Sequence, residues 1–115
     1  MNVEKFQSLT FGIEKSPAEL LDDEKLILGL LEKISKIANL TVVGELVRKF
    51  EPQGITAILA LSESHVAIHT WPEKSRAYIT LTTCSSVNFE KKQQIAQEIL
   101  KSLRTEKIIT KETKC

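Results

Sequence analysis

The chain has 115 residues, a length that predicts one domain with a core of ordinary size. Its 16 lysines and arginines offset 15 aspartates and glutamates, and a net charge of +1 disfavours nucleic acid or an anionic membrane as the main partner. No apolar run reaches the length of a membrane span and residues 1–10 lack a signal-peptide pattern, so we expect a cytoplasmic protein with no membrane partner. The two cysteines, Cys84 and Cys115, do not form a disulfide framework.

The first third of the chain predicts a strand followed by a helix. Residues 4–14 mix apolar and polar side chains and read as a strand. Ser16-Pro17 marks a turn or a short helical start, and the acidic residues 22–24 suit a helix N-terminus. Apolar residues then recur at three- and four-residue spacing, as in an amphipathic helix. They are Ile27, Leu30, Leu31, Ile34 and Ala38.

The middle of the chain predicts strands separated by short turns. Residues 40–50 are rich in valine and leucine and read as a strand, and residues 51–54 (EPQG) read as a turn. The run Ile55–Leu61 is almost entirely apolar, so we expect a central strand that is covered on both faces. Two further strands are expected over residues 65–71 and 76–84, joined by a turn at 72–75.

The last third predicts a second amphipathic helix and a short strand over residues 107–111, with Asn88 as the helix N-cap. The expected order is β-α-β-β-β-β-α-β in a single domain. Short turns favour antiparallel pairing, and two helices on one face complete an α+β fold. We therefore expect a two-layer α/β sandwich with a mainly antiparallel sheet.

Reactive side chains concentrate in residues 61–73, LSESHVAIHTWPE, which hold both histidines and the only tryptophan. The period of a strand places His65, His69 and Trp71 on one face. If residues 72–75 close a hairpin, Trp71 lies opposite Arg76 and His69 lies opposite Tyr78. Cys84 then arrives beside Glu63-Ser64. This register predicts one polar pocket shared by the serine, both histidines and the thiol.

Three chemistries compete for that pocket, although each side chain taken alone has an ordinary structural explanation. A Ser–His hydrolase lacks an orienting acid and a Gly-x-Ser-x-Gly elbow. Zinc could use His65, His69 and Cys84, but no recognised zinc spacing is present. The third chemistry is self-processing, in which a serine hydroxyl attacks the preceding carbonyl and a pyruvoyl group forms at a new N-terminus.

Three motifs resemble one family, the prokaryotic S-adenosylmethionine decarboxylase proenzymes. They are SESHVAIHTWPE at residues 62–73, KFEPQGIT at residues 49–56 and TTCS at residues 82–85. The resemblance implies self-cleavage between Glu63 and Ser64 into a β chain, 1–63, and an α chain, 64–115. Ser64 would become a pyruvoyl group that binds the substrate amine as a Schiff base and acts as an electron sink. The products would be CO₂ and decarboxylated S-adenosylmethionine, the aminopropyl donor for spermidine.

The same resemblance implies residue roles. His69 matches the histidine that accepts a proton during processing, Thr56 matches a hydroxyl residue that assists it, and Cys84 matches the proton donor of decarboxylation. The substrate-binding residues would be Phe50 and Trp71, which flank the adenine, and Glu73, which binds the ribose hydroxyls. The family forms homodimers of processed protomers, and the resemblance implies no metal.

Some positions depart from the family pattern. Arg48 replaces a histidine, Ser75-Arg76 replaces a Gly-Tyr pair, Thr80 replaces an acidic residue and Ser85 replaces a glycine. These changes keep two alternatives open: a pyruvoyl-dependent decarboxylase of arginine or ornithine, and an unprocessed, non-catalytic paralogue. Phe50, Trp71 and Glu73 favour the nucleoside substrate.

Overall fold

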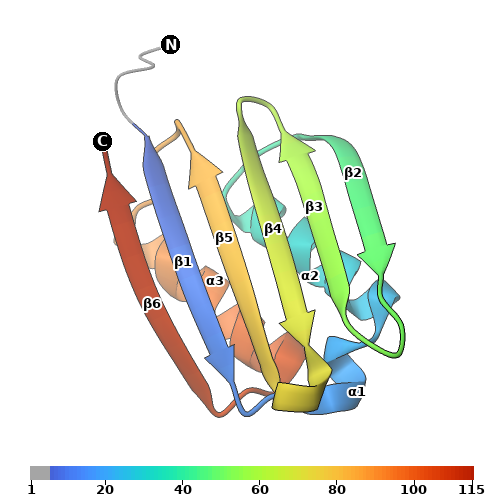
Figure 1. Ribbon diagram of the computed structural model, residues 1–115. Coiled ribbons are helices and arrows are strands. Elements are labelled where there is room, and N and C mark those ends of the chain that lie inside the picture. Colours follow the sequence, from blue (N-terminus) through green and yellow to red (C-terminus); the bar gives the residue numbers. More distant parts are fainter. Residues whose placement is uncertain (1–5) are drawn as a thin grey trace.

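The structure is a computed structural model that describes residues 6–115. Six strands form one antiparallel sheet in the order β2-β3-β4-β5-β1-β6, and Figure 1 shows both long helices on the same side of it. The elements are β1 Gln7–Glu14, α1 Ala18–Leu21, α2 Glu24–Ile37, β2 Val42–Lys49, β3 Ile55–Leu61, β4 Ser64–Trp71, η1 Pro72–Lys74, β5 Arg76–Thr83, α3 Phe89–Leu103 and β6 Lys107–Lys114. This arrangement confirms the predicted α+β fold and the order of its strands and long helices. Among the described residues, no helix combines the length and the hydropathy of a bilayer-spanning segment.

The ends of the chain differ most from prediction. The first strand was expected over residues 4–14, and β1 starts at Gln7; residues 4 and 5 lie outside the described part of the chain. The last strand was expected to stop at residue 111, yet β6 continues to Lys114 because it pairs with β1 from Glu14↔Lys107 to Gln7↔Lys114. The residues of an exposed edge strand alternate little between apolar and polar, so the length of such a strand cannot be predicted from the sequence pattern.

The expectation that β3 is covered on both faces is wrong for the single chain. Ile55, Ala57, Leu59 and Leu61 are buried against the helices, while Ala60 on the other face is exposed. Figure 1 shows that, within residues 6–115, no helix covers this second face of the sheet, which we call the open face. Its apolar strand residues therefore have no partner layer within one chain.

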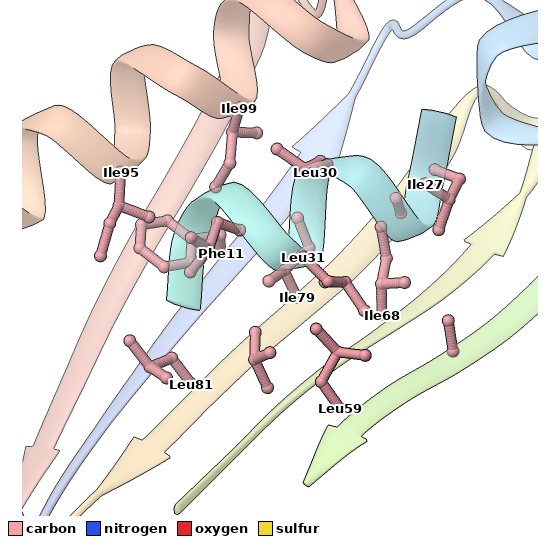
Figure 2. Close-up of a cluster of buried hydrophobic side chains, with 14 of the residues drawn as sticks. Phe11, Ile27, Leu30, Leu31, Leu59, Ile68, Ile79, Leu81, Ile95 and Ile99 are labelled. Carbon is pink, nitrogen blue, oxygen red and sulfur yellow. The ribbon is translucent and has the colours of Figure 1, made fainter. Parts of the chain in front are cut away.

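The core lies between the sheet and the two long helices, as Figure 2 shows. Alternate residues of each central strand point into it, and α2 and α3 supply residues at helical spacing. The labelled members are Phe11, Ile27, Leu30, Leu31, Leu59, Ile68, Ile79, Leu81, Ile95 and Ile99, all at most 1% exposed. Both helices start at side-chain caps: Asp23 accepts from the backbone N–H of Leu26, and Asn88 accepts from that of Lys91.

The turn between β2 and β3 depends on Gly54. Its carbonyl accepts the Phe50 N–H at 2.8 Å, and its φ of 112° lies where side chains are rarely tolerated. A Cβ here would also lie 3.3 Å from the Thr70 carbonyl oxygen. The predicted turn is thus confirmed, and it sets Phe50 beside the end of β4.

Core packing gives a first prediction. Leu31→Ala should lower the free energy of unfolding by about 2–5 kcal/mol, because Leu31 is fully buried and the cavity left behind cannot collapse completely. Leu100→Ala is the matched control on α3, since Leu100 is 43% exposed and surface changes cost about 0.5 kcal/mol or less. Urea unfolding followed by circular dichroism measures both. An equal loss of unfolding free energy in the two variants would contradict the placement of Leu31 in the core between the sheet and the helices.

Candidate active site

The register of the β4–β5 hairpin is the predicted one. Trp71 pairs with Arg76 and His69 with Tyr78, and the ladder closes with Ser64 opposite Thr83. The thiol of the next residue, Cys84, donates to the Glu63 carbonyl oxygen with a sulfur–oxygen distance of 3.6 Å. The structure therefore confirms that Cys84 lies beside Glu63-Ser64.

The Glu63–Ser64 peptide bond lies at a tight turn. Leu61 pairs with Ser64 across β3 and β4, so the hairpin loop contains only Ser62 and Glu63. The Ser62 N–H donates to the Thr41 carbonyl at 3.0 Å, which holds the loop against the start of β2. Glu63 has a φ of 58°, a left-handed conformation that costs a non-glycine residue about 1–2 kcal/mol. Backbone strain is thus stored next to this peptide bond.

The hydroxyl of Ser64 has a defined partner. It donates to the Oγ1 atom of Thr83 at 2.9 Å, and the same oxygen accepts the Ser85 N–H, also at 2.9 Å. Thr83 is only 1% exposed. Thr83 belongs to the TTCS motif at residues 82–85, but the sequence alone assigned it no role. The hairpin register could have found it, because counting back from the turn places residue 83 opposite Ser64.

A second side chain holds the segment after β5. Buried Gln7 accepts the Val87 N–H at 3.0 Å and donates to the Val87 carbonyl at 3.4 Å. This two-point contact fixes residues 84–88 between β5 and α3, and so restrains Cys84. Sequence analysis missed Gln7, because a polar residue on the inner face of a strand gives no sign of its partner.

A cavity of about 780 Å³ adjoins Cys84. Its lining also includes Phe6 and Cys115, whose backbones pair at 2.9 and 3.1 Å where β1 and β6 end. Lys92 lies at its rim and donates to the Glu112 carboxylate, and this hydrogen bond is the main cause of a lowered pKa of Glu112. The thiol therefore faces a space large enough for a small molecule.

The remaining candidate residues gather at the opposite end of β4. His69 and Thr56 are cross-strand partners, and the His69 Nδ1 lies 2.9 Å from the Thr56 Oγ1. The Trp71 ring centroid lies 6.2 Å from that of His69. These three residues line a cavity of about 310 Å³ together with Phe50 and Glu73. An imidazole, two aromatic rings and a carboxylate thus share one small site.

The two groups do not meet within one chain, so the expectation of a single shared pocket is wrong. Ser64 and His69 are five positions apart, which is about 16 Å along a strand. Strand alternation also puts Ser64 on the helix-facing side with Val66, whereas His69 lies on the open face. The sequence pattern placed both histidines on one face, but it did not place the serine.

The arrangement also bears on the hydrolase and zinc alternatives. His65 is exposed on the open face opposite Thr82, and His69 lies about 13 Å further along the same strand. Within residues 6–115, no three His, Cys, Asp or Glu side chains are grouped as metal ligands. Neither a Ser–His pair nor the set His65, His69 and Cys84 is assembled in this chain.

Two departures from the family pattern have a structural context. The Arg48 guanidinium lies 5.8 Å from the centroid of the Phe50 ring, a cation–π contact at the edge of the smaller cavity. Ser75 ends η1 with a φ of 54°, the left-handed conformation for which glycine is the usual residue. Ser75 therefore occupies a turn position at which its carbonyl accepts the Ser16 N–H at 3.1 Å.

Comparisons with known proteins identify a family for this chain. The sequence model of the family described as S-adenosylmethionine decarboxylase matches residues 7–114. The chain is 39% identical over 85 residues to an S-adenosylmethionine decarboxylase proenzyme from Prochlorococcus marinus, covering 73% of this chain and 70% of that protein. It is 36% identical over 78 residues to one from Archaeoglobus fulgidus, covering 68% and 67%. These names do not favour the amino-acid alternative.

A solved structure is similar throughout. The crystal structure of the adenosylmethionine decarboxylase from Aquifex aeolicus superposes with a TM-score of 0.80 at 28% identity, covering 94% of this chain and 88% of that one. The fold, the match over residues 7–114 and the relatives agree. The chain therefore belongs to the S-adenosylmethionine decarboxylase family of carboxy-lyases.

Proposed function

We propose that the chain is a proenzyme that cleaves itself between Glu63 and Ser64 and then decarboxylates S-adenosylmethionine. The observation that carries this proposal is the environment of one peptide bond. The Ser64 hydroxyl follows the bond directly, the Cys84 thiol donates to its carbonyl oxygen, and Glu63 before it is held in a left-handed conformation. A nucleophile, a polarising donor and strain thus converge on the bond that has to break.

Self-cleavage would proceed in two stages. The Ser64 Oγ attacks the Glu63 carbonyl carbon, the C–N bond breaks, and the hydroxyl proton ends on the released amine, so an ester replaces the amide. Removal of the Ser64 Cα proton then breaks the Cβ–Oγ bond and frees the Glu63 carboxylate. The dehydroalanine left at residue 64 tautomerises to an imine. Water hydrolyses this imine and releases ammonia, which leaves a pyruvoyl group at the N-terminus of chain 64–115.

The residues around position 64 fit such a group. The new N-terminus would lie beside Cys84, which borders a cavity of about 780 Å³. A pyruvoyl ketone supplies an electron sink for the carbon that loses CO₂. Cys84 would then return a proton to that carbon, a role that suits a thiol already within hydrogen-bond reach of the cleavage point.

The smaller cavity suits the nucleoside part of the substrate. Phe50 and Trp71 offer ring faces for the adenine, and the Glu73 carboxylate can accept hydrogen bonds from the ribose hydroxyls. In the tautomer whose Nδ1–H donates to the Thr56 Oγ1, this bond orients the His69 ring and leaves Nε2 to accept the Cα proton during processing.

A second copy of the chain would bring the two separated groups together. The open face carries apolar side chains without a covering layer: Leu46 (67% exposed), Trp71 (41%), Tyr78 (43%) and Ile109 (45%). Two such sheets can pack face to face about a two-fold axis. If the axis runs across the strands, the His69 end of each chain lies over the Ser64 end of the other. We therefore propose a homodimer in which each complete site uses both chains. The cytoplasmic location stays a prediction of the sequence.

Cleavage itself is tested by Ser64→Ala. This variant should remain a single chain of 115 residues and release no CO₂, because the attacking oxygen is gone. Ser62→Ala is the matched control in the same two-residue loop and should be cut normally. Intact mass under denaturing conditions distinguishes one chain from fragments 1–63 and 64–115. An uncut wild-type protein would contradict the proposal.

The role of Cys84 is tested by Cys84→Ala. The variant should still cleave, because Ser64 is intact and a thiol is a weak hydrogen-bond donor. Its turnover should fall by about 10²–10⁴-fold, the usual contribution of a general acid. The assay is CO₂ release from carboxyl-labelled S-adenosylmethionine, with arginine and ornithine as substrates that should give none. Cys115→Ala is the control thiol, and equal turnover in both variants would remove Cys84 from this role.

The two-chain site is tested by complementation. His69→Ala should cleave at least about 10²-fold more slowly than wild type, because the acceptor of the Cα proton is missing. Co-expression with Ser64→Ala should restore cleavage of the His69→Ala chain only, because the partner then supplies the histidine. Mass spectrometry distinguishes the two precursors. No rescue in mixed dimers would mean that His69 acts within its own chain or not at all.

A further inference from the structure

The side chain that holds the Ser64 hydroxyl in place is Thr83. The two residues are directly opposite in the β4–β5 ladder, on the helix-facing side of the sheet. The Ser64 Oγ donates to the Thr83 Oγ1 at 2.9 Å, and Thr83 is 1% exposed. Ser64 itself is partly exposed, but its acceptor is held inside the sheet–helix layer, so the serine has a defined resting orientation.

The acceptor oxygen is itself fixed. The Thr83 Oγ1 accepts the Ser85 N–H at 2.9 Å as well as the Ser64 hydroxyl, so both of its acceptor positions are used. A threonine side chain also has few rotamers. Cys84 lies between the two residues that this contact joins. The Thr83 hydroxyl thus restrains the Ser64 side chain, and it also restrains the segment that carries the Cys84 thiol.

We propose that Thr83 is a positioning residue for self-cleavage, which holds the Ser64 Oγ in the rotamer from which it attacks the Glu63 carbonyl carbon. This inference rests on the function proposed above. Thr83 transfers no proton and forms no bond to the reacting carbon. Without it, the Ser64 hydroxyl rotates among its rotamers, and misplacement of a reacting atom by about 1 Å can slow a step by about 10²-fold.

The decisive variant is Thr83→Val, which keeps the branched shape and removes the hydroxyl. It should cleave about 10- to 100-fold more slowly than wild type in a time course of intact mass after cell-free synthesis of the full chain. Thr83→Ser restores the hydroxyl and should cleave within a few-fold of wild type. Cleavage of Thr83→Val at the wild-type rate would overturn the proposal.

Two controls separate positioning from loss of stability. Thr82→Val removes the neighbouring hydroxyl, which contacts the Ser8 hydroxyl at 3.1 Å and lies on the open face, and it should cleave normally. Leu31→Ala lowers the stability of the fold at a site far from the turn. Its cleavage rate therefore shows how much slowing a lower thermal midpoint causes by itself. If cleavage rates follow the midpoints of all variants on one curve, Thr83 is merely structural and the proposal fails.

The outcomes also separate this inference from the function on which it rests. An uncut wild-type chain refutes both. A cut wild type with a fast Thr83→Val variant refutes only the role of Thr83. If Thr83→Val does not fold, Thr83→Ala provides the same comparison in a smaller side chain, and it should again cleave slowly while Thr83→Ser cleaves well.

Discussion

The antiparallel register of β4 on β5 is the constraint on which the site depends. It sets Ser64 opposite Thr83 and delivers Cys84 to the Glu63 carbonyl, and at the other end it sets Trp71 opposite Arg76 beside η1. A shift of one residue would turn every side chain of β4 to the other face. The buried residues Val66 and Ile68 oppose such a shift, because it would move them out of the core.

The same alternation divides the chemistry between two faces and two ends of one sheet. Ser64 shares the helix-facing side with the core, whereas Thr56 and His69 lie on the open face about 16 Å away. On the helix-facing side, the hydroxyl of the proposed nucleophile is held by the buried Thr83. An open side lets the histidine and the aromatic cavity act on something outside their own chain. The proposed homodimer would reconcile these requirements, because a second sheet would cover the open face and bring the missing groups.

Most of the fold could be predicted because local signals and burial agree. The periodicity of α2 and α3, the acidic start at residue 24 and the glycine of the 51–54 turn each have a strong local cause. The pairing of Trp71 with Arg76 followed from one short turn. Four features did not follow: the bare face of β3, the length of β6, the role of Gln7 and the separation of Ser64 from His69. The first three each depend on which distant element packs nearby, and periodicity within one segment does not carry that information.

The position of the proposed cleavage point in the sheet explains how the two products would stay associated after cleavage. The bond lies in a two-residue loop, so breaking it leaves the ladder between β3 and β4 intact. The segment 1–63 contributes β1, which pairs with β5 on one side and with β6 on the other, both from segment 64–115. The two proposed products would thus be held together through a shared sheet and a shared core. Strain at Glu63 can be released by cleavage without loss of the packing that holds Cys84 and the new N-terminus together.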